Sequence, residues 1–243
     1  LETNRGRAVK SVRDDRGYNQ GWAESRATNV RAERRCDYMI SRMRSPLSGS
    51  VLEIGCGTGQ NSFFLARKTG LRVLGTDICV PFIEEASERF QLPNLRYAVL
   101  DFNQASQFEG ETFDYIVGNG ILHHLYHHLA AALTNMRRLL KPGGKIVFLE
   151  PNLYNPYVFS IFRMPYLRKV AHLEPDEMAF TKGYVTKLLE GAGYTDIDVE
   201  YKDFLLPGIP DFLIAPSIAA GAVLERIPIV RMTSQSIFIT ATR

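Results

Sequence analysis

The chain has 243 residues, of which 45% are hydrophobic and 23% are charged, and its formal net charge is +3. This length and composition suit one well-buried domain with extensions and are too small for two large domains. So small a net charge does not by itself indicate a nucleic-acid partner. Residues 1–44 carry eleven Lys and Arg against six Asp and Glu, which predicts either a solvated helix face or a face toward a phosphate-bearing substrate.

The cysteines and the hydropathy pattern bear on the compartment. Cys36, Cys56 and Cys79 form no C-x-x-C pair, which argues against a disulfide framework and fits a reducing compartment. The first residues are polar and Arg-rich, unlike a signal peptide. Residues 204–224 are the most apolar long stretch, but three prolines and an aspartate argue against a membrane span. We therefore expect a soluble, cytoplasmic protein.

The hydrophobic pattern predicts strands that alternate with helices. A helix is expected over residues 22–43. The pattern then favours strands over 50–54, 72–77, 95–101, 113–120 and 145–151, and helices over 60–70, over 81–90 and from 129 to a stop at Pro142 and Gly143. After an aromatic, Pro-rich stretch come a helix over 181–193 and strands over 195–204 and 234–243. This alternation predicts an α/β fold with a parallel, doubly wound sheet.

The run VLEIGCGTGQN, residues 51–61, predicts a strand, a glycine turn and the start of a helix. Such a turn binds nucleotide-like ligands at the carboxyl end of a sheet. A dinucleotide site usually has G-x-G-x-x-G, whereas Gln60 stands here where the third glycine would be. Glu53 would repel a pyrophosphate and would attract the ammonium and sulfonium groups of S-adenosylmethionine. We therefore favour S-adenosylmethionine over NAD.

Two aspartates follow the next two strands. Asp77 ends the second strand, where it could accept hydrogen bonds from both ribose hydroxyls of either cofactor. Asp101 ends the third strand, where it could accept from the adenine amino group or act as a turn or N-cap residue. Both positions support a nucleoside site at the carboxyl edge of the sheet.

The ordered set VLEIGCGTG, VLGTDI, VLDF, FDYIVGNGILHHL and LLKPGGKIVFLEP resembles the class I S-adenosylmethionine-dependent methyltransferases. The resemblance covers residues 45–151 closely. It implies a Rossmann-like three-layer sandwich, with a seven-stranded, mostly parallel sheet, an antiparallel last strand and an N-terminal helical cap. The cap would span residues 1–44 and the methyltransferase domain 45–243, with inserts on the acceptor side at about 152–180 and 204–232.

The resemblance also implies a set of residues that bind S-adenosylmethionine and release S-adenosylhomocysteine. The glycine turn would lie behind the methionine part, Asp77 would bind ribose, Asp101 and Phe102 would lie near adenine, and the N-terminal helix would close over the cofactor. The expected cofactor-binding residues are Glu53, Gly55, Cys56, Gly57, Gly59, Asn61, Asp77, Ile78, Asp101, Phe102, Asn119, Gly120, Trp22 and Tyr18.

The segment HHLYHH, which contains His123, His124, His127 and His128, follows the fourth strand. His123 and His124 are our candidates for a general base, which methyl transfer needs when the nucleophile must lose a proton. The alternative is one packing histidine and one polar rim residue. The i,i+4 spacing of the histidines would suit a metal, but no further acidic or cysteine ligand stands nearby in the sequence, so we expect none. Glu150 is expected to point at the acceptor or to anchor a loop.

The acceptor is expected to be a small molecule. The motifs of methyltransferases that act on exocyclic amines of nucleic acids are absent after the fourth strand. The apolar segment 204–232 favours a hydrophobic or lipid-linked acceptor, a buried lid, or a homodimer contact. Arg163, Arg168 and Lys169 suggest either a phosphate-bearing acceptor or surface charges. Two other functions stay open: an RNA methyltransferase, and a protein that binds the cofactor without catalysis.

Overall fold

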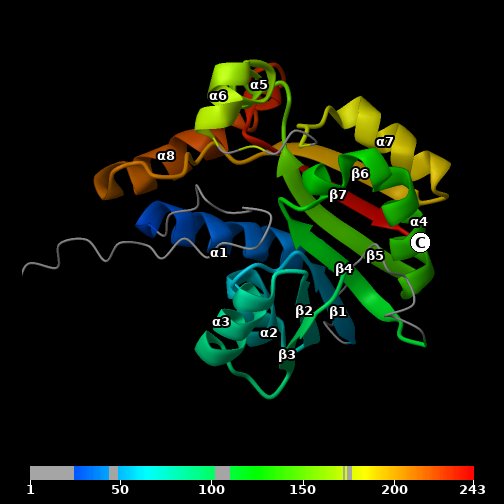
Figure 1. Ribbon diagram of the computed structural model, residues 1–243. Helices are drawn as coiled ribbons and strands as arrows, with labels where there is room; N and C mark the ends of the chain where they lie inside the picture. The colour runs from blue at the N-terminus through cyan, green and yellow to red at the C-terminus, as the bar shows by residue number, and fades with distance from the viewer. Residues whose placement is uncertain (1–24, 44–48, 102–109, 172, 174–176) are drawn as a thin grey trace, which may run out of the picture.

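The structure is a computed structural model that describes residues 25–43, 49–101, 110–171, 173 and 177–243. One seven-stranded sheet runs through it in the order β3-β2-β1-β4-β5-β7-β6 (Figure 1). Only β7 is antiparallel to its neighbours, β5 and β6, which confirms the predicted antiparallel last strand. The strands are β1 Ser50–Ile54, β2 Arg72–Asp77, β3 Leu95–Val99, β4 Phe113–Asn119, β5 Leu140–Pro151, β6 Thr195–Lys202 and β7 Ser236–Thr242.

Helices cover both faces of the sheet, as the resemblance implies (Figure 1). One face carries α1 Arg26–Ser41, α2 Gln60–Thr69 and α3 Val80–Arg89, and the other carries α4 Leu129–Leu139 and α7 Lys182–Gly191. Each central strand is apolar on both sides because it has a helical layer on each face. In β1, Leu52 and Ile54 pack toward α4 and α7, whereas Val51 packs toward α1 and α2.

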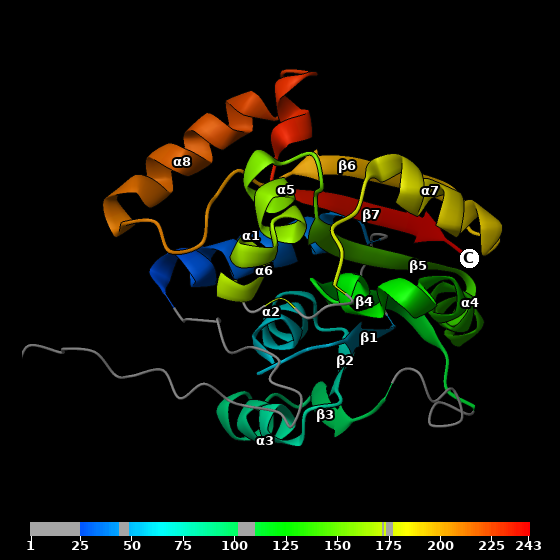
Figure 2. The ribbon, with the colours of Figure 1, turned by 45° about the horizontal axis from the view of Figure 1, so that its top comes forward.

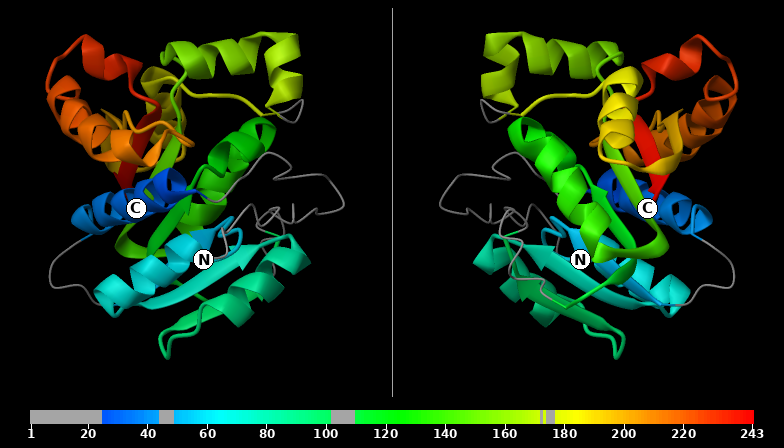
Figure 3. Two further views of the ribbon diagram at one scale, coloured as in Figure 1. Left: turned by 90° about the vertical axis from the view of Figure 1, so that its left-hand side faces the viewer. Right: turned by 90° about the vertical axis from the view of Figure 1, so that its right-hand side faces the viewer.

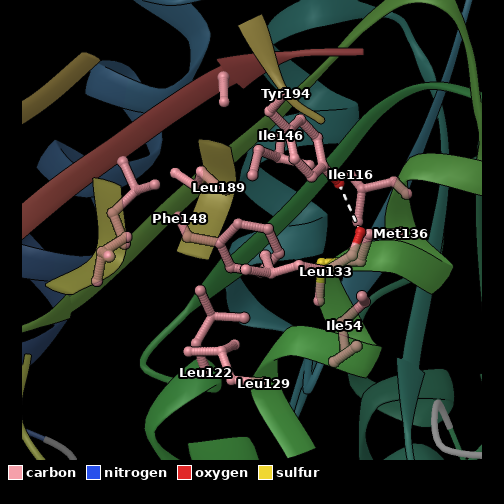
Figure 4. Packing of buried hydrophobic residues seen from close by; sticks show 14 of the residues in the cluster. Ile54, Ile116, Leu122, Leu129, Leu133, Met136, Ile146, Phe148, Leu189 and Tyr194 are labelled. Carbon is pink, nitrogen blue, oxygen red and sulfur yellow. Dashed lines mark hydrogen bonds between the residues drawn. The ribbon is translucent and has the colours of Figure 1, made fainter. Parts of the chain in front are cut away.

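Phe148 of β5 lies at the centre of the larger core cluster, between Leu189 of α7 and Leu133 of α4 (Figure 4). Tyr194 is buried in the same cluster, and its hydroxyl donates to the backbone carbonyl of Leu133 at 3.0 Å. The hydrogen bond satisfies a phenol that would otherwise lose its contact with water. This core holds β4 and β5 in place, and the histidine segment follows the end of β4.

Three elements differ from the sequence prediction. The first helix begins at Arg26, after the N-cap Ser25, whose hydroxyl accepts from the backbone N–H of Thr28. The helix predicted to stop at Pro142 and Gly143 ends at Leu139, and the strand predicted over 145–151 begins earlier, at Leu140; Pro142 lacks the N–H that a helix needs and Gly143 has φ +74°. The Pro-broken segment 204–224 contains a helix, α8 Asp211–Leu224, despite Pro216 inside it.

The two predicted inserts form a further layer of the molecule. The first contains α5 Pro156–Arg163 and α6 Pro165–Val170, and the second contains α8. Figures 1, 2 and 3 show this layer on the side of the molecule away from α3, with α8 alongside α1. Short 3-10 helices cover Leu122–His128 and Val230–Thr233. None of the described helices combines the length and the apolar character that a membrane span requires.

Candidate active site

A cavity of about 550 Å³ lies at the carboxyl ends of β1, β2 and β4. Its lining includes many residues that the sequence predicted for the cofactor or for catalysis: Glu53, Gly55, Cys56, Gly57, Asn61, Asp77, Ile78, Asp101, Asn119, Gly120, His123 and His124. Gly59 is not among the lining residues. Tyr18, Trp22 and Phe102 lie outside the described residues, so their predicted roles stay predictions. The sequence prediction missed Glu177 and four residues of α1: Thr28, Arg31, Ala32 and Arg35.

Asp77 holds the glycine turn in its shape. Its two carboxylate oxygens accept from the backbone N–H groups of Gly57 and Cys79, each at 2.9 Å. Gly57 has φ +52°, and a Cβ there would contact nothing within 4 Å, so the turn is open on this side. Gly59 has φ +82°, and its Cβ would lie 2.6 Å from the Tyr97 hydroxyl. Gly59 is therefore required for close packing of α2 on the sheet.

Glu53 is a buried residue of β1 that lies beside the start of α2. Its carboxylate accepts from Asn61 Nδ2 at 2.7 Å and from the Ser62 hydroxyl. Burial raises the pKa of Glu53 to about 7, although both hydrogen bonds oppose this shift. Asn61 Oδ1 is buried without a hydrogen-bond partner among the described residues. Two acceptors therefore stand at the cavity wall, and a cationic donor such as an ammonium group would satisfy both.

His123 is oriented by a buried carboxylate. Its Nδ1 lies 2.8 Å from Oε2 of Glu150, the side chain of which is fully buried. Glu150 also accepts from the backbone N–H groups of Ile121, Leu122 and His123 at 2.8–3.2 Å. Glu150 thus caps the 3-10 turn and fixes the imidazole. The loop that it was expected to anchor is the one that follows it in the chain, whereas the structure bonds it to the turn that contains His123.

His124 has a carboxylate of its own. Its Nδ1 lies 3.1 Å from Oε1 of Glu177, and its ring centroid is 4.2 Å from that of His123. Burial opposes the charged form, but the hydrogen bond to Glu177 and the charges of Glu177, Glu150 and Asp77 raise the pKa of His124.

This carboxylate corrects the metal argument. The expectation that no acidic residue accompanies the histidines is wrong, because ligand atoms of His123, His124 and Glu177 lie within 4.8 Å of one another. The segment is a 3-10 helix, in which residues three apart share a face, so the i,i+4 spacing of an α-helix does not apply to it. The two histidines and Glu177 could ligate a divalent cation, although the His–Glu contact is also satisfied without one.

The basic residues of α1 are tied into the fold. Arg31 Nε and Arg35 Nε each donate to Oδ2 of Asp203 at 2.9 Å. Arg35 also donates to Oδ1 of Asn119 at 2.9 Å, at the cavity wall. The two guanidinium groups lower the pKa of Asp203 to about 2 despite its burial. These two residues are therefore neither a solvated face nor free cations.

The aromatic residues of the first insert are divided between the core and the surface. Phe162 is buried, with its ring centroid 6.4 Å from that of His123, but Tyr154, Tyr157 and Phe159 are exposed. Arg168 donates to the backbone carbonyls of Phe162 and Glu177 at 3.0–3.3 Å. Arg168 thus links α5 and α6 to the histidine site.

Comparison with known proteins shows the family to which the chain belongs. Residues 51–144 match the family model described as "Methyltransferase domain". The chain is 30% identical over 190 residues to the ubiquinone/menaquinone biosynthesis C-methyltransferase UbiE of Desulfotalea psychrophila. The aligned region covers 70% of this chain and 74% of that protein. A crystal structure of a SAM-dependent methyltransferase from Archaeoglobus fulgidus shares the fold, with a TM-score of 0.63 at 18% identity over 88% of this chain and 94% of the other.

A different type of relative is far longer. The chain is 31% identical over 172 residues to the highly reducing polyketide synthase lcsB of Purpureocillium lilacinum. The aligned region covers 65% of this chain but only 7% of the synthase. The chain thus spans a small part of such a protein. With the fold, the glycine turn and these matches, the chain belongs to the class I S-adenosylmethionine-dependent methyltransferases. Its cofactor is S-adenosylmethionine, as the sequence predicted.

Proposed function

We propose that the protein methylates a carbon atom of a small-molecule acceptor, a carbon made acidic by a neighbouring carbonyl group, with His123 as the general base. The observation that carries this proposal is the 2.8 Å contact between His123 Nδ1 and the fully buried Glu150. Because Nδ1 faces a carboxylate, the neutral ring holds its proton there and leaves Nε2 as the base. The relative UbiE, described as a C-methyltransferase, supports a carbon acceptor.

The cofactor fits the wall formed by the start of α2. We assign Glu53 and the unpartnered Asn61 Oδ1 to its ammonium group, and Asp77 to its ribose. Leu100, Asp101 and Ile78 of the same cavity would lie against adenine. This placement directs the sulfonium toward Asn119 and Gly120 and thus toward the histidine pair that follows them in the chain.

The reaction then needs one proton transfer and one displacement. His123 Nε2 removes a proton from the acceptor carbon, and the C–H electron pair forms an enolate. S-adenosylmethionine, held by Glu53, Asn61 and Asp77, would supply the methyl group to which this carbon forms its new bond, and the electron pair of the broken S–CH₃ bond would stay on sulfur. The products are the C-methylated acceptor and S-adenosylhomocysteine. His124, whose charged form is favoured by Glu177, is placed to donate a hydrogen bond to the enolate oxygen.

RNA methylation is less well supported. The basic N-terminal segment was its main sequence signal, but Arg31 and Arg35 are engaged with Asp203, Asn119, Gln235 and Ser236. Side chains with this many partners contribute little to the salt-dependent phosphate contacts that bind RNA.

The test is turnover with S-adenosylmethionine and three acceptors: an acetoacetyl thioester, a catechol and a primary amine. We expect methylation of the thioester at carbon, identified by NMR of the product. His123→Gln should lower kcat about 10²–10⁴-fold and leave cofactor affinity unchanged.

The matched control is Thr195→Gln, on the far edge of β6, which should turn over normally. Methylation of the catechol or amine alone would overturn the carbon acceptor. Full activity of His123→Gln would show that His123 is not the general base.

A further inference from the structure

The exposed large hydrophobic residues are concentrated in the two inserts. Thirteen of the seventeen in the described part of the chain fall within residues 154–170 and 206–232. We call these thirteen the apolar cap: Tyr154, Tyr157, Phe159, Met164, Tyr166, Val170, Leu206, Phe212, Leu213, Val223, Ile227, Ile229 and Met232. Tyr166 and Phe212 are each 76% exposed and Ile229 is 81% exposed. Such a concentration on a folded chain indicates an interaction surface.

Helix α8 shows that this exposure is a property of a whole face. Only its Ile214, Ile218 and Gly221 side packs, against Ala27 and Val30 of α1 and against Leu205 and Phe204. The outward residues from Phe212 to Val223 are apolar as well, and α8 carries no charged residue after Asp211. A helix that is apolar all round is normally covered on all sides. Here the outer face has no cover from the described chain.

Among the described residues of the two inserts, the exposed charged side chains are mainly basic. Arg163, Lys169, Arg226 and Arg231 are exposed in the two inserts. The inserts' two described acids between 204 and 232 are engaged: Asp211 lies 3.7 Å from Arg26, and Glu225 accepts from Lys202 and from the backbone of Asp203. Aromatic and aliphatic side chains interspersed with Lys and Arg favour an anionic lipid surface.

The apolar cap borders the active site. The ring centroid of Phe162 of α5 lies 6.4 Å from that of His123, and α1, which packs against α8 through Ala27 and Val30, also supplies Arg31 and Arg35 to the cavity. Figures 1 and 2 show α5, α6 and α8 together on this side of the molecule. The two inserts that carry the apolar cap therefore adjoin elements that line the cavity.

We propose that the apolar cap docks this methyltransferase on an anionic lipid bilayer. A second copy of the chain is the less favoured occupant, because a symmetric dimer through the same face would bring Arg163, Lys169, Arg226 and Arg231 near their own copies, while the acids described between 204 and 232 already have basic partners. The docking does not depend on the acceptor. If the proposed carbon acceptor is correct, docking would let a lipid-soluble acceptor reach the histidines from the bilayer.

The experiment is co-flotation of the whole chain with vesicles of phosphatidylcholine alone or mixed with phosphatidylglycerol. We expect binding to the mixed vesicles that weakens as salt is raised, and weaker binding to phosphatidylcholine. Phe212→Ser with Ile229→Ser should lower the partition coefficient about tenfold or more. Arg226→Gln with Arg231→Gln should remove part of the salt-dependent binding.

The matched control is Val80→Ser with Val99→Ser, two exposed hydrophobic residues outside the inserts, which should bind vesicles like the unaltered chain. Calorimetric binding of S-adenosylhomocysteine to every variant reports folding independently of the membrane, and so separates a failure of docking from a failure of the proposed function. Absence of binding to both vesicle types would overturn the proposal. So would a dimer in light scattering that the Phe212/Ile229 variant converts to a monomer, since the face would then be a contact between copies.

Discussion

At the scale of single residues, Glu53 links cofactor binding to protonation. Its pKa of about 7 means that roughly half of the molecules carry a neutral Glu53 at pH 7 when no cofactor is bound. An ammonium group placed beside it would favour the ionised form and lower that pKa. Cofactor binding at pH 7 should therefore release about half a proton from Glu53, and the release should fade by pH 8.5.

Calorimetry in buffers of different ionisation enthalpy measures this proton release. Glu53→Gln cannot titrate, so the difference between the two proteins isolates the contribution of Glu53 from that of the cofactor's own amino group. The variant should also bind S-adenosylmethionine more weakly, because a neutral amide attracts a cation less than a carboxylate does. Equal proton release by both proteins would place the ammonium group elsewhere in the cavity.

The second residue-scale prediction concerns His124 and Glu177. Glu177→Gln removes the charge that does most to favour the protonated imidazole, so the pKa of His124 should fall. NMR titration of the histidine Cε1 protons follows this change directly, with His124→Gln to assign the signal. If His124 donates to the enolate, kcat of Glu177→Gln should decline at a lower pH than that of the unaltered enzyme. A His124 signal that titrates identically in both proteins would mean that Glu177 does not control the imidazole.

At the scale of elements, Asp203 fastens α1 to the end of β6. Asp203→Asn leaves the buried Arg31 and Arg35 without an anionic partner, so it should cost about 3–5 kcal/mol of unfolding free energy. Asn suits the φ of +74° at this position, so backbone strain does not confuse the result. Urea unfolding at pH 7 measures the loss. The matched control is Asp196→Asn, at an exposed position that also has a positive φ, and it should leave the unfolding free energy nearly unchanged.

The elements also show where sequence reasoning reaches its limit. Strands, glycine turn and helix ends could be predicted because each follows from local chemistry: apolar runs, the positive φ of glycine, and the missing N–H of proline. Glu177 and Asp203 could not, because each meets its partners only after distant segments pack. The basic residues of α1 were visible, but only the fold shows that Arg31 and Arg35 face one aspartate. The 3-10 geometry of the histidine segment was likewise hidden, because its composition resembles that of a helix.

At the scale of the whole molecule, two buried carboxylates with opposite pKa shifts should shape the pH dependence of stability. Asp203 ionises more readily in the fold, with a pKa of about 2 against an ordinary 3.8, so its stabilisation of about 2 kcal/mol is present above pH 4 and is lost as pH falls toward 2. Glu53 ionises less readily, with a pKa of about 7 against 4.5, so the cofactor-free fold should lose about 3 kcal/mol as pH rises from 4.5 to 7.

From these two groups alone, the unfolding free energy of the cofactor-free protein should be greatest near pH 4 to 5. Subtracting the pH curve of each variant from that of the unaltered chain isolates the contribution of the substituted residue. Urea unfolding at a series of pH values should show the unfolding free energy of Glu53→Gln rising relative to that of the unaltered chain between pH 4.5 and 7. The deficit in unfolding free energy of Asp203→Asn should shrink below pH 4. Saturating S-adenosylmethionine should remove most of the Glu53 slope, because its ammonium group stabilises the carboxylate that burial disfavours. If the curve of Glu53→Gln instead runs parallel to that of the unaltered chain over this range, the buried carboxylate is already ionised without cofactor, and the folded protein supplies the compensation that is assigned here to the ligand.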